Sequence, residues 1–133
     1  MITEDYIRNK YLGTPFKHRG RFVDGLDCYG LIIRVYEDLG FKLFDIDDEY
    51  DTDWAWKGRN LFIENYHKEW EKVEKPGLFD VVLFCVNNKG IANHGGIVLK
   101  DGFFLHSCKA GTVVAQLSDW SKYLEGFYHY KKL

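Results

Sequence analysis

One cysteine and two histidines are placed in the sequence where they could act together as a nucleophile and its base. Cys28 follows Asp27 in a glycine-containing stretch and begins an apolar pattern at helical spacing. At a helix N-terminus, free amide groups and the helix dipole stabilise a thiolate, so we expect a lowered pKa for this thiol. A plain core cysteine is the alternative, because cysteine also packs well in apolar interiors. The segment alone favours neither interpretation.

The candidate bases are His94 and His106, which lie in two consecutive expected strands. A two-residue turn at Asp101 and Gly102 would point the two imidazoles to opposite faces of the sheet. In a three-residue loop over 100–102, with Gly102 left-handed in a G1 bulge, Leu99 pairs with Phe103 instead. The histidines then become diagonal neighbours on one face, about 7 Å apart at Cβ, which allows an imidazole–imidazole hydrogen bond.

In the three-residue-loop register, Cys108 lies opposite His94 on the same face. Gly95 and Gly96 follow His94 and are expected to leave room for the helix and a substrate. The first imidazole would accept the proton of Cys28, and the second would hold the first in the correct tautomer. The alternative is that the histidines are ordinary polar residues of a half-exposed sheet, and spacing alone leaves both interpretations open.

Zinc is the other chemistry that three cysteines and five histidines suggest. The sequence has no CxxC or HxxxH spacing, and Cys85 reads as a residue of a core strand. We therefore expect no metal and no cofactor. The acidic run 45–53 resembles a calcium loop only superficially, because Tyr50 and Trp56 stand where a glycine and a bidentate glutamate are needed. A solvated acidic loop is the better interpretation.

Composition favours one folded domain over residues 1–133, with 29% charged and 46% hydrophobic residues and a net charge of −2. This balance gives no electrostatic reason to expect nucleic-acid binding. The first residues lack a signal-peptide pattern, and no apolar run approaches membrane-spanning length. We expect synthesis in a reducing cytoplasm without membrane insertion, which does not determine where the protein acts, because a particle or cell lysis could release it.

The pattern along the chain predicts an α+β fold in which helices precede an antiparallel meander. Thr3 and Asp27 are expected to cap the first two helices, which end at Gly13 and Gly40. Residues 14–25 read as a loop, and His67 and His129 as surface residues. Helices are expected near 3–12, 28–39 and 58–70, and strands over 80–86, 94–99, 103–108, 112–115 and 126–130, with a short helical turn near 118–120.

Several segments together resemble the NlpC-like cell-wall cysteine peptidases, and the order Cys, His, His agrees. The similarity extends nearly end to end over residues 11–16, 26–31, 93–99 and 104–107. Residues 15–21 and 120–128 resemble the bacteriophage tail and prophage branch of this family in particular.

The resemblance implies a circularly permuted papain-like fold and hydrolysis of the peptidoglycan stem peptide, typically between D-glutamate and diaminopimelate or lysine. It implies that Cys28 is the nucleophile, His94 the general base and His106 the orienting residue. Phe16 stands where the family usually has a tyrosine that is thought to contact the cysteine. The expected partners are the stem peptide and other phage tail proteins, with the protein carried on a virion tail or released to act on the cell wall.

Phe16, His18, Arg19 and Asp27 are the expected substrate-binding residues. The basic residues of this set, together with Arg21, could hold substrate carboxylates or be solvated loop charges. Two further functions remain open at this stage. One is a structural tail-assembly protein of the same fold with little or no hydrolase activity. The other is acyl transfer to a lipid or amine, for which the sequence offers no apolar anchor.

Overall fold

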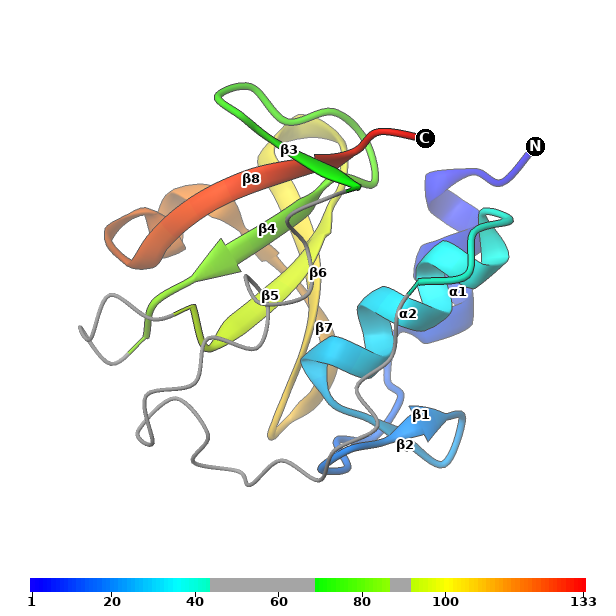
Figure 1. Cartoon of the computed structure of the whole chain (residues 1–133). Coiled ribbons are helices and arrows are strands. Elements are labelled where there is room, and N and C mark those ends of the chain that lie inside the picture. The colour runs from blue at the N-terminus through cyan, green and yellow to red at the C-terminus, as the bar shows by residue number, and fades with distance from the viewer. Residues whose placement is uncertain (44–68, 87–91) are drawn as a thin grey trace.

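The computed structural model of the chain describes residues 1–43, 69–86 and 92–133. It has an α+β fold in which the two α-helices lie on one side of a six-stranded antiparallel sheet (Figure 1). The third expected helix up to residue 68, the acidic run 45–53, the turn 87–90 and His67 lie outside the described residues. The elements are α1 (Glu4–Tyr11), β1 (Arg21–Phe22), β2 (Gly25–Leu26), α2 (Cys28–Asp38), β3 (Trp70–Val73), β4 (Val81–Phe84), β5 (His94–Val98), η1 (Lys100–Gly102), β6 (Phe103–Cys108), β7 (Gly111–Gln116), η2 (Leu117–Tyr123) and β8 (Leu124–Tyr130).

The two N-terminal helices begin at the capping residues that the sequence predicts. The side chain of Thr3 accepts a hydrogen bond from Tyr6 N in α1, and that of Asp27 accepts one from Gly30 N in α2. Such bonds satisfy amide groups that have no partner within the helix. Gly40 follows α2 with a φ of 97°, a left-handed conformation that glycine adopts without steric strain. Both helix predictions are confirmed.

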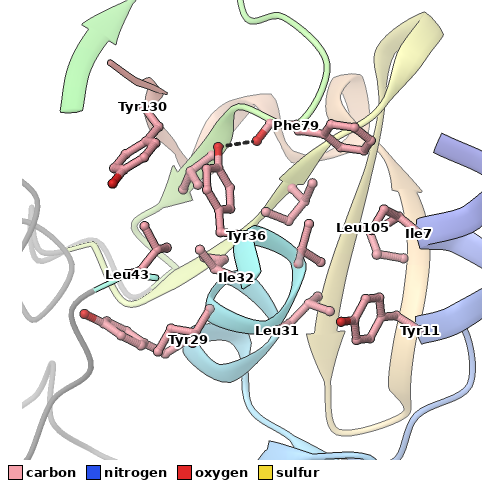
Figure 2. Close-up of a cluster of buried hydrophobic side chains, with 14 of the residues drawn as sticks. Ile7, Tyr11, Tyr29, Leu31, Ile32, Tyr36, Leu43, Phe79, Leu105 and Tyr130 are labelled. Carbon is pink, nitrogen blue, oxygen red and sulfur yellow. Dashed lines mark hydrogen bonds between the residues drawn. The ribbon is translucent and has the colours of Figure 1, made fainter. Parts of the chain in front are cut away.

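Helix α2 packs its apolar face on the sheet and holds the main core together (Figure 2). Leu31, Ile32 and Val35 are fully buried, as their helical spacing predicts. The ring of Tyr36 lies in the same core, and its hydroxyl donates a 2.5 Å hydrogen bond to the carbonyl oxygen of Phe79. A buried hydroxyl without a partner would destabilise the fold, so this bond is what permits a tyrosine here.

The register between β5 and β6 is the one predicted from a three-residue loop. Ile97 pairs with Leu105, and the Leu99 amide donates a hydrogen bond to the Phe103 carbonyl. Gly102 is left-handed as expected, with a φ of 81°. Asp101 is left-handed as well, with a φ of 59°, which the sequence analysis did not predict.

Gly96 was expected to leave room for the helix and a substrate, but in the structure it faces strand β6. A Cβ atom at this position would lie 2.6 Å from the carbonyl oxygen of Leu105 and 3.2 Å from the Cβ of His106. Glycine here therefore allows β5 and β6 to approach closely, and the expectation that it clears room for helix and substrate was wrong for Gly96.

Three features of the sheet region differ from the predictions. Segment 14–25, expected to be a loop, contains the antiparallel pair β1–β2. Trp70, expected at the end of a helix, begins strand β3, where its ring packs 4.9 Å from that of Tyr130. The strand order is β3-β8-β4-β5-β6-β7, so β8 lies between β3 and β4 and the sheet is not a simple meander. Pairings between segments so distant in the chain leave no local sequence signal.

His129 is partly exposed, in agreement with the expected surface position, and its Nδ1 lies 2.8 Å from the buried carboxylate of Asp80. Cys85 directly follows β4 and is half-buried, so it lies at the end of that strand rather than inside it. Within the described part of the chain, no helix is both long and apolar enough to cross a membrane.

Candidate active site

Cys28, His94 and residues near His106 converge on one open pocket of about 380 Å³. The N-terminal part of the chain contributes one wall, with Phe16, His18, Asp27 and Cys28. The sheet and η2 contribute the opposite wall, with Asn93, His94, Ser107, Cys108, Lys109 and Trp120. The pocket therefore brings the N-terminus of α2 against the start of β5 and the end of β6.

The Cys28 thiol is held at the first position of α2, directly after the capping residue Asp27. One contact from strand β6 and one from the loop before β1 fix this helix end. The hydroxyl of Ser107 donates a 2.7 Å bond to the Leu26 carbonyl, which ties β6 to the residues just before the helix. A Cβ on Gly30 would lie 2.0 Å from the carbonyl oxygen of Gly20, so the loop before β1 packs tightly on the first turn of α2. The thiol is thus presented by a tightly packed helix start.

The predicted contact between the two histidines is present. His94 Nε2 lies 2.8 Å from His106 Nδ1, and the two rings meet edge to face with centroids 5.0 Å apart. Because this bond occupies Nε2 of His94, only its Nδ1 is left to accept a thiol proton. Nδ1 can accept only if the ring proton is on Nε2, which then donates to the unprotonated Nδ1 of His106. The hydrogen bond is compatible with this tautomer of His94, which is the one that a base requires.

Burial keeps the Cys28 thiol and the imidazoles of His94 and His106 uncharged before any substrate binds. It lowers the pKa of His94 to about 3, with a smaller contribution from His106, and it lowers the pKa of His106 to about 4. Burial also raises the pKa of the Cys28 thiol to about 12, and the neighbouring Asp27 carboxylate adds to this effect. Hydrogen bonding from the Gly95 and Tyr29 backbone lowers the same pKa without offsetting burial.

The expected lowering of the Cys28 pKa was therefore wrong. Part of the side chain is still accessible from the pocket, but the surrounding protein removes most of the water that would solvate a thiolate. The helix N-terminus does not outweigh that loss. The site holds a neutral thiol beside a neutral imidazole, and deprotonation of Cys28 needs a base within reach.

Asp27 is held by an ion pair as well as by its capping bond. Its carboxylate accepts hydrogen bonds from Gly30 N at 2.7 Å, Arg21 Nη1 at 3.0 Å and Arg19 N at 3.1 Å. Only 5% of the residue is exposed, so the Arg21 guanidinium compensates a nearly buried charge. Although Asp27 lines the pocket, its oxygens are already engaged by the helix and by the loop before β1.

Only some of the expected substrate-binding residues line the pocket. Phe16 and His18 line the pocket, and Phe16 is 38% exposed there. Arg19 is not among the described residues that line it; its backbone is left-handed, with a φ of 60°. The guanidinium of Arg21 is directed to Asp27 instead of the pocket. The structure thus brings together Phe16, His18 and Asp27 beside the thiol, and leaves the two arginines outside the pocket wall.

Six of the residues that line the pocket were not predicted as site residues: Val86, Asn93, Ser107, Cys108, Lys109 and Trp120. Trp120 lies on η2, and its indole stacks on the His94 imidazole at 5.6 Å. Asn93 precedes the base, and Lys109 lies on the turn after β6. A tryptophan in the otherwise polar segment 118–122 was the one sequence signal available, because an isolated large aromatic residue seldom lies in a polar turn without a packing partner.

No group of three or more His, Cys, Asp or Glu side chains suitable for a metal ion exists among residues 1–43, 69–86 and 92–133. Cys28, Cys85 and Cys108 are all free thiols. Cys108 shares the pocket with Cys28, and its Sγ lies 3.4 Å from the carbonyl oxygen of Gly111.

The sequence model of the NlpC/P60 family matches residues 13–130 of the chain. Solved structures with the same fold include the NlpC/p60 domain of the peptidoglycan hydrolase SagA. It has a TM-score of 0.62 and 19% identity, and 92% of each chain is covered. An NLP/P60 family protein of Staphylococcus aureus, described as similar to a lipoprotein, has a TM-score of 0.69 and 20% identity. An NlpC/P60 family protein of Bacillus cereus has a TM-score of 0.67 and 21% identity.

The match covers 97% of this chain in both of the latter cases, but only 42% of the Staphylococcus aureus protein and 40% of the Bacillus cereus protein. The chain thus spans less than half the length of these two proteins. No curated protein is similar enough to the chain to count as a relative.

Proposed function

Because the chain belongs to the NlpC/P60 family, we propose that it is a cysteine peptidase that hydrolyses the stem peptides of peptidoglycan. The observation that carries this proposal is the shared pocket of Cys28 and His94, with His94 hydrogen-bonded to His106. A nucleophile, a base and an orienting group in this order are the parts that peptide hydrolysis by a thiol requires. SagA, a structural neighbour, is described as a peptidoglycan hydrolase, in agreement with the proposed substrate class.

In the proposed mechanism, Nδ1 of His94 removes the proton of the Cys28 thiol while the sulfur attacks the peptide carbonyl carbon. The thiol and the imidazole are neutral before the reaction because both are buried. A charged imidazolium and a charged oxyanion therefore form only during the attack. The backbone amide of Cys28 donates to the developing oxyanion, because it lies in the first turn of α2, where amide groups have no partner within the helix. The imidazolium then protonates the leaving amine, and water hydrolyses the thioester with His94 again acting as the base.

The family resemblance supports two further proposals, which concern the bond cleaved and the assembly in which the protein acts. We propose that the bond cleaved is of the D-glutamyl–diaminopimelate or D-glutamyl–lysine type, and that the protein acts in association with a phage tail or a prophage. His18 at the pocket wall is placed to contact the substrate, and Phe16 offers it an apolar surface. Binding by Arg19 would require the exposed guanidinium to reach the mouth of the pocket from outside.

The test is to incubate the purified protein with defined stem peptides and with whole peptidoglycan, and to analyse the products by mass spectrometry. A Cys28→Ala variant serves as the control, with its fold compared by circular dichroism. We expect the wild type to release a new amino terminus at the diaminopimelate or lysine residue and the variant to be inactive. A folded but inactive wild type would favour the structural tail-assembly role, and cleavage by Cys28→Ala would contradict the mechanism.

A further inference from the structure

A second apolar cluster covers the face of the sheet that α2 does not cover. Its buried members are Val82, Phe84, Val98 and Phe104. The short helix η2 and the strands beside it supply the partly buried residues that pack on this cluster, which are Ala115, Leu117, Trp120, Tyr123 and Phe127. Trp120 differs from the other members of the cluster because it also lines the candidate active-site pocket.

The indole of Trp120 contacts both candidate histidines, in two different geometries. Its plane is inclined by only 25° to that of the His94 imidazole, with ring centroids 5.6 Å apart, so the two rings are stacked. It meets His106 nearly edge on, at 5.0 Å and 76°. A single rigid side chain therefore defines the position of both rings whose nitrogens form the 2.8 Å hydrogen bond.

Three other aromatic rings hold the indole in place. Phe84 lies 5.2 Å from it, Phe104 lies 5.8 Å away at 83°, and Tyr123 lies 5.9 Å away at 64°. Phe84 and Phe104 are rooted in β4 and β6, and both are at most 1% exposed. The indole has little freedom to move, because packed aromatic rings favour a small set of offset and edge-to-face arrangements.

We propose that Trp120 is a positioning residue for the reaction, because its stacked indole fixes the orientation of the His94 imidazole and shields the His94–His106 hydrogen bond from water. This inference rests on the proposed function of the same site. A stacked ring obstructs rotation of the imidazole about its side-chain bond, so Nδ1 stays turned towards the space shared with Cys28. Removal of water strengthens the bond between the two imidazoles, since electrostatic interactions are stronger in a medium of low dielectric constant.

The same contact is suited to the protonated state that the mechanism requires. When His94 accepts the thiol proton, its ring becomes a cation lying on the face of an indole, which attracts cations through its quadrupole. Trp120 would thus act through His94 before and after proton transfer, without touching the reacting carbon or sulfur atom.

The test compares Trp120→Leu with Trp120→Phe and a matched control, Phe127→Leu. Phe127 lies on β8 and belongs to the same cluster, but it is not among the described residues that line the pocket or that contact the Trp120 ring. Each variant is measured for kcat and KM on a stem peptide, and for the rate at which iodoacetamide alkylates Cys28, quantified by mass spectrometry of the Cys28 peptide. Urea unfolding reports whether the fold is retained.

We expect Trp120→Leu to lower kcat by about tenfold or more with little change in KM. A base that is out of position loses most of its acceleration of the reaction but does not change how the substrate binds. Alkylation of Cys28 should slow in parallel. Trp120→Phe retains a flat aromatic face and should recover most of both rates. Phe127→Leu, destabilised to a similar extent, should stay within about twofold of the wild type.

The inference would be overturned if folded Trp120→Leu matched the wild type in both rates, if its alkylation became faster, or if Phe127→Leu lost as much activity. Alkylation of Cys28 does not require peptidoglycan. The positioning role of Trp120 can therefore be tested even if the proposed substrate is wrong. A wild type that is inactive on stem peptides, with Cys28 alkylation that depends on Trp120, would refute the substrate and support the positioning role.

Discussion

His94 Nε2 and His106 Nδ1 lie 2.8 Å apart, and this distance determines which nitrogen of His94 is left to act as a base. His106 itself is 3% exposed and does not appear among the residues that line the pocket. Its contribution to the proposed reaction is therefore indirect, through the tautomer and the orientation of His94.

Replacement of His106 by alanine should lower kcat by roughly 10²-fold, because His94 would lose both its fixed tautomer and its hydrogen bond. KM should change little, since His106 lies behind the pocket wall. His106→Gln retains an acceptor near the imidazole and should recover part of the rate. Steady-state kinetics on a stem peptide measures both effects. Equal losses in the alanine and glutamine variants would argue against an orienting hydrogen bond.

The pH dependence should reflect the low pKa of His94. Burial lowers this pKa to about 3 from the usual 6.5, so the base stays unprotonated over most of the acidic range. We expect kcat/KM to remain nearly constant from about pH 7 to about pH 5 and to fall only below that range. An acidic midpoint close to 6.5 would contradict the buried, neutral base inferred from the structure.

The free energy of unfolding should begin to fall at a higher pH than kcat/KM does. The folded-state pKa values of His94 and His106 lie below the value of 6.5 for an exposed histidine, so the unfolded chain binds more protons between about pH 4 and 6.5. The free energy of unfolding should therefore decrease as pH falls through this window and be fully regained above 6.5. Urea unfolding at pH 7.5 and 5.0 tests the sign, and a smaller decrease is expected in His106→Gln.

The ion pair between Arg21 and Asp27 should matter more than an exposed pair. In Arg21→Gln, the nearly buried Asp27 carboxylate would lose its counter-charge, at a cost of about 3 kcal/mol in the free energy of unfolding. The pKa of Cys28 should also rise further, because Arg21 opposes the effect of Asp27 on the thiol. Alkylation of Cys28 should consequently be slower than in the wild type.

Lys17→Gln provides the control for that measurement. Lys17 forms a 2.9 Å ion pair with Asp24, in which both side chains are about 60% exposed. Such pairs contribute little, so the unfolding free energy should change by less than about 1 kcal/mol. Comparable losses in Lys17→Gln and Arg21→Gln would show that burial of Asp27 is not the deciding factor.

Gly30 should tolerate no side chain, because a Cβ atom there would lie 2.0 Å from the Gly20 carbonyl oxygen. We expect Gly30→Ala to destabilise the fold by about 2 kcal/mol or more and to displace the loop that carries His18, with a loss of activity. Gly40→Ala is the comparison, since its φ of 97° is strained for alanine but its surroundings are open. That variant should cost about 1 kcal/mol and leave activity unchanged.

The candidate site could be predicted from the sequence where local rules decide the geometry. Asp27 and Gly40 define the ends of α2, and the loop with Gly102 sets the register that brings the two histidines together. The pKa of Cys28 could not be predicted, because it depends on how completely other segments bury the thiol. The position of Trp120 could not be predicted from the sequence either, since only packing against β4 and β6 places η2 beside the histidines.

The position of β8 between β3 and β4 determines when this sheet can be completed. Residues 124–130 come after every other strand along the chain, yet they supply the hydrogen-bond partner for the outer side of β4. Until they emerge from the ribosome, the hairpin β4–β5 has an unpaired edge and β3 has no neighbour, a situation that promotes pairing with other chains. The described residues that form the candidate pocket all precede β8 along the chain, so they are synthesised before the strand that completes the sheet. Folding of this chain should therefore be slow relative to synthesis and sensitive to truncation after residue 123.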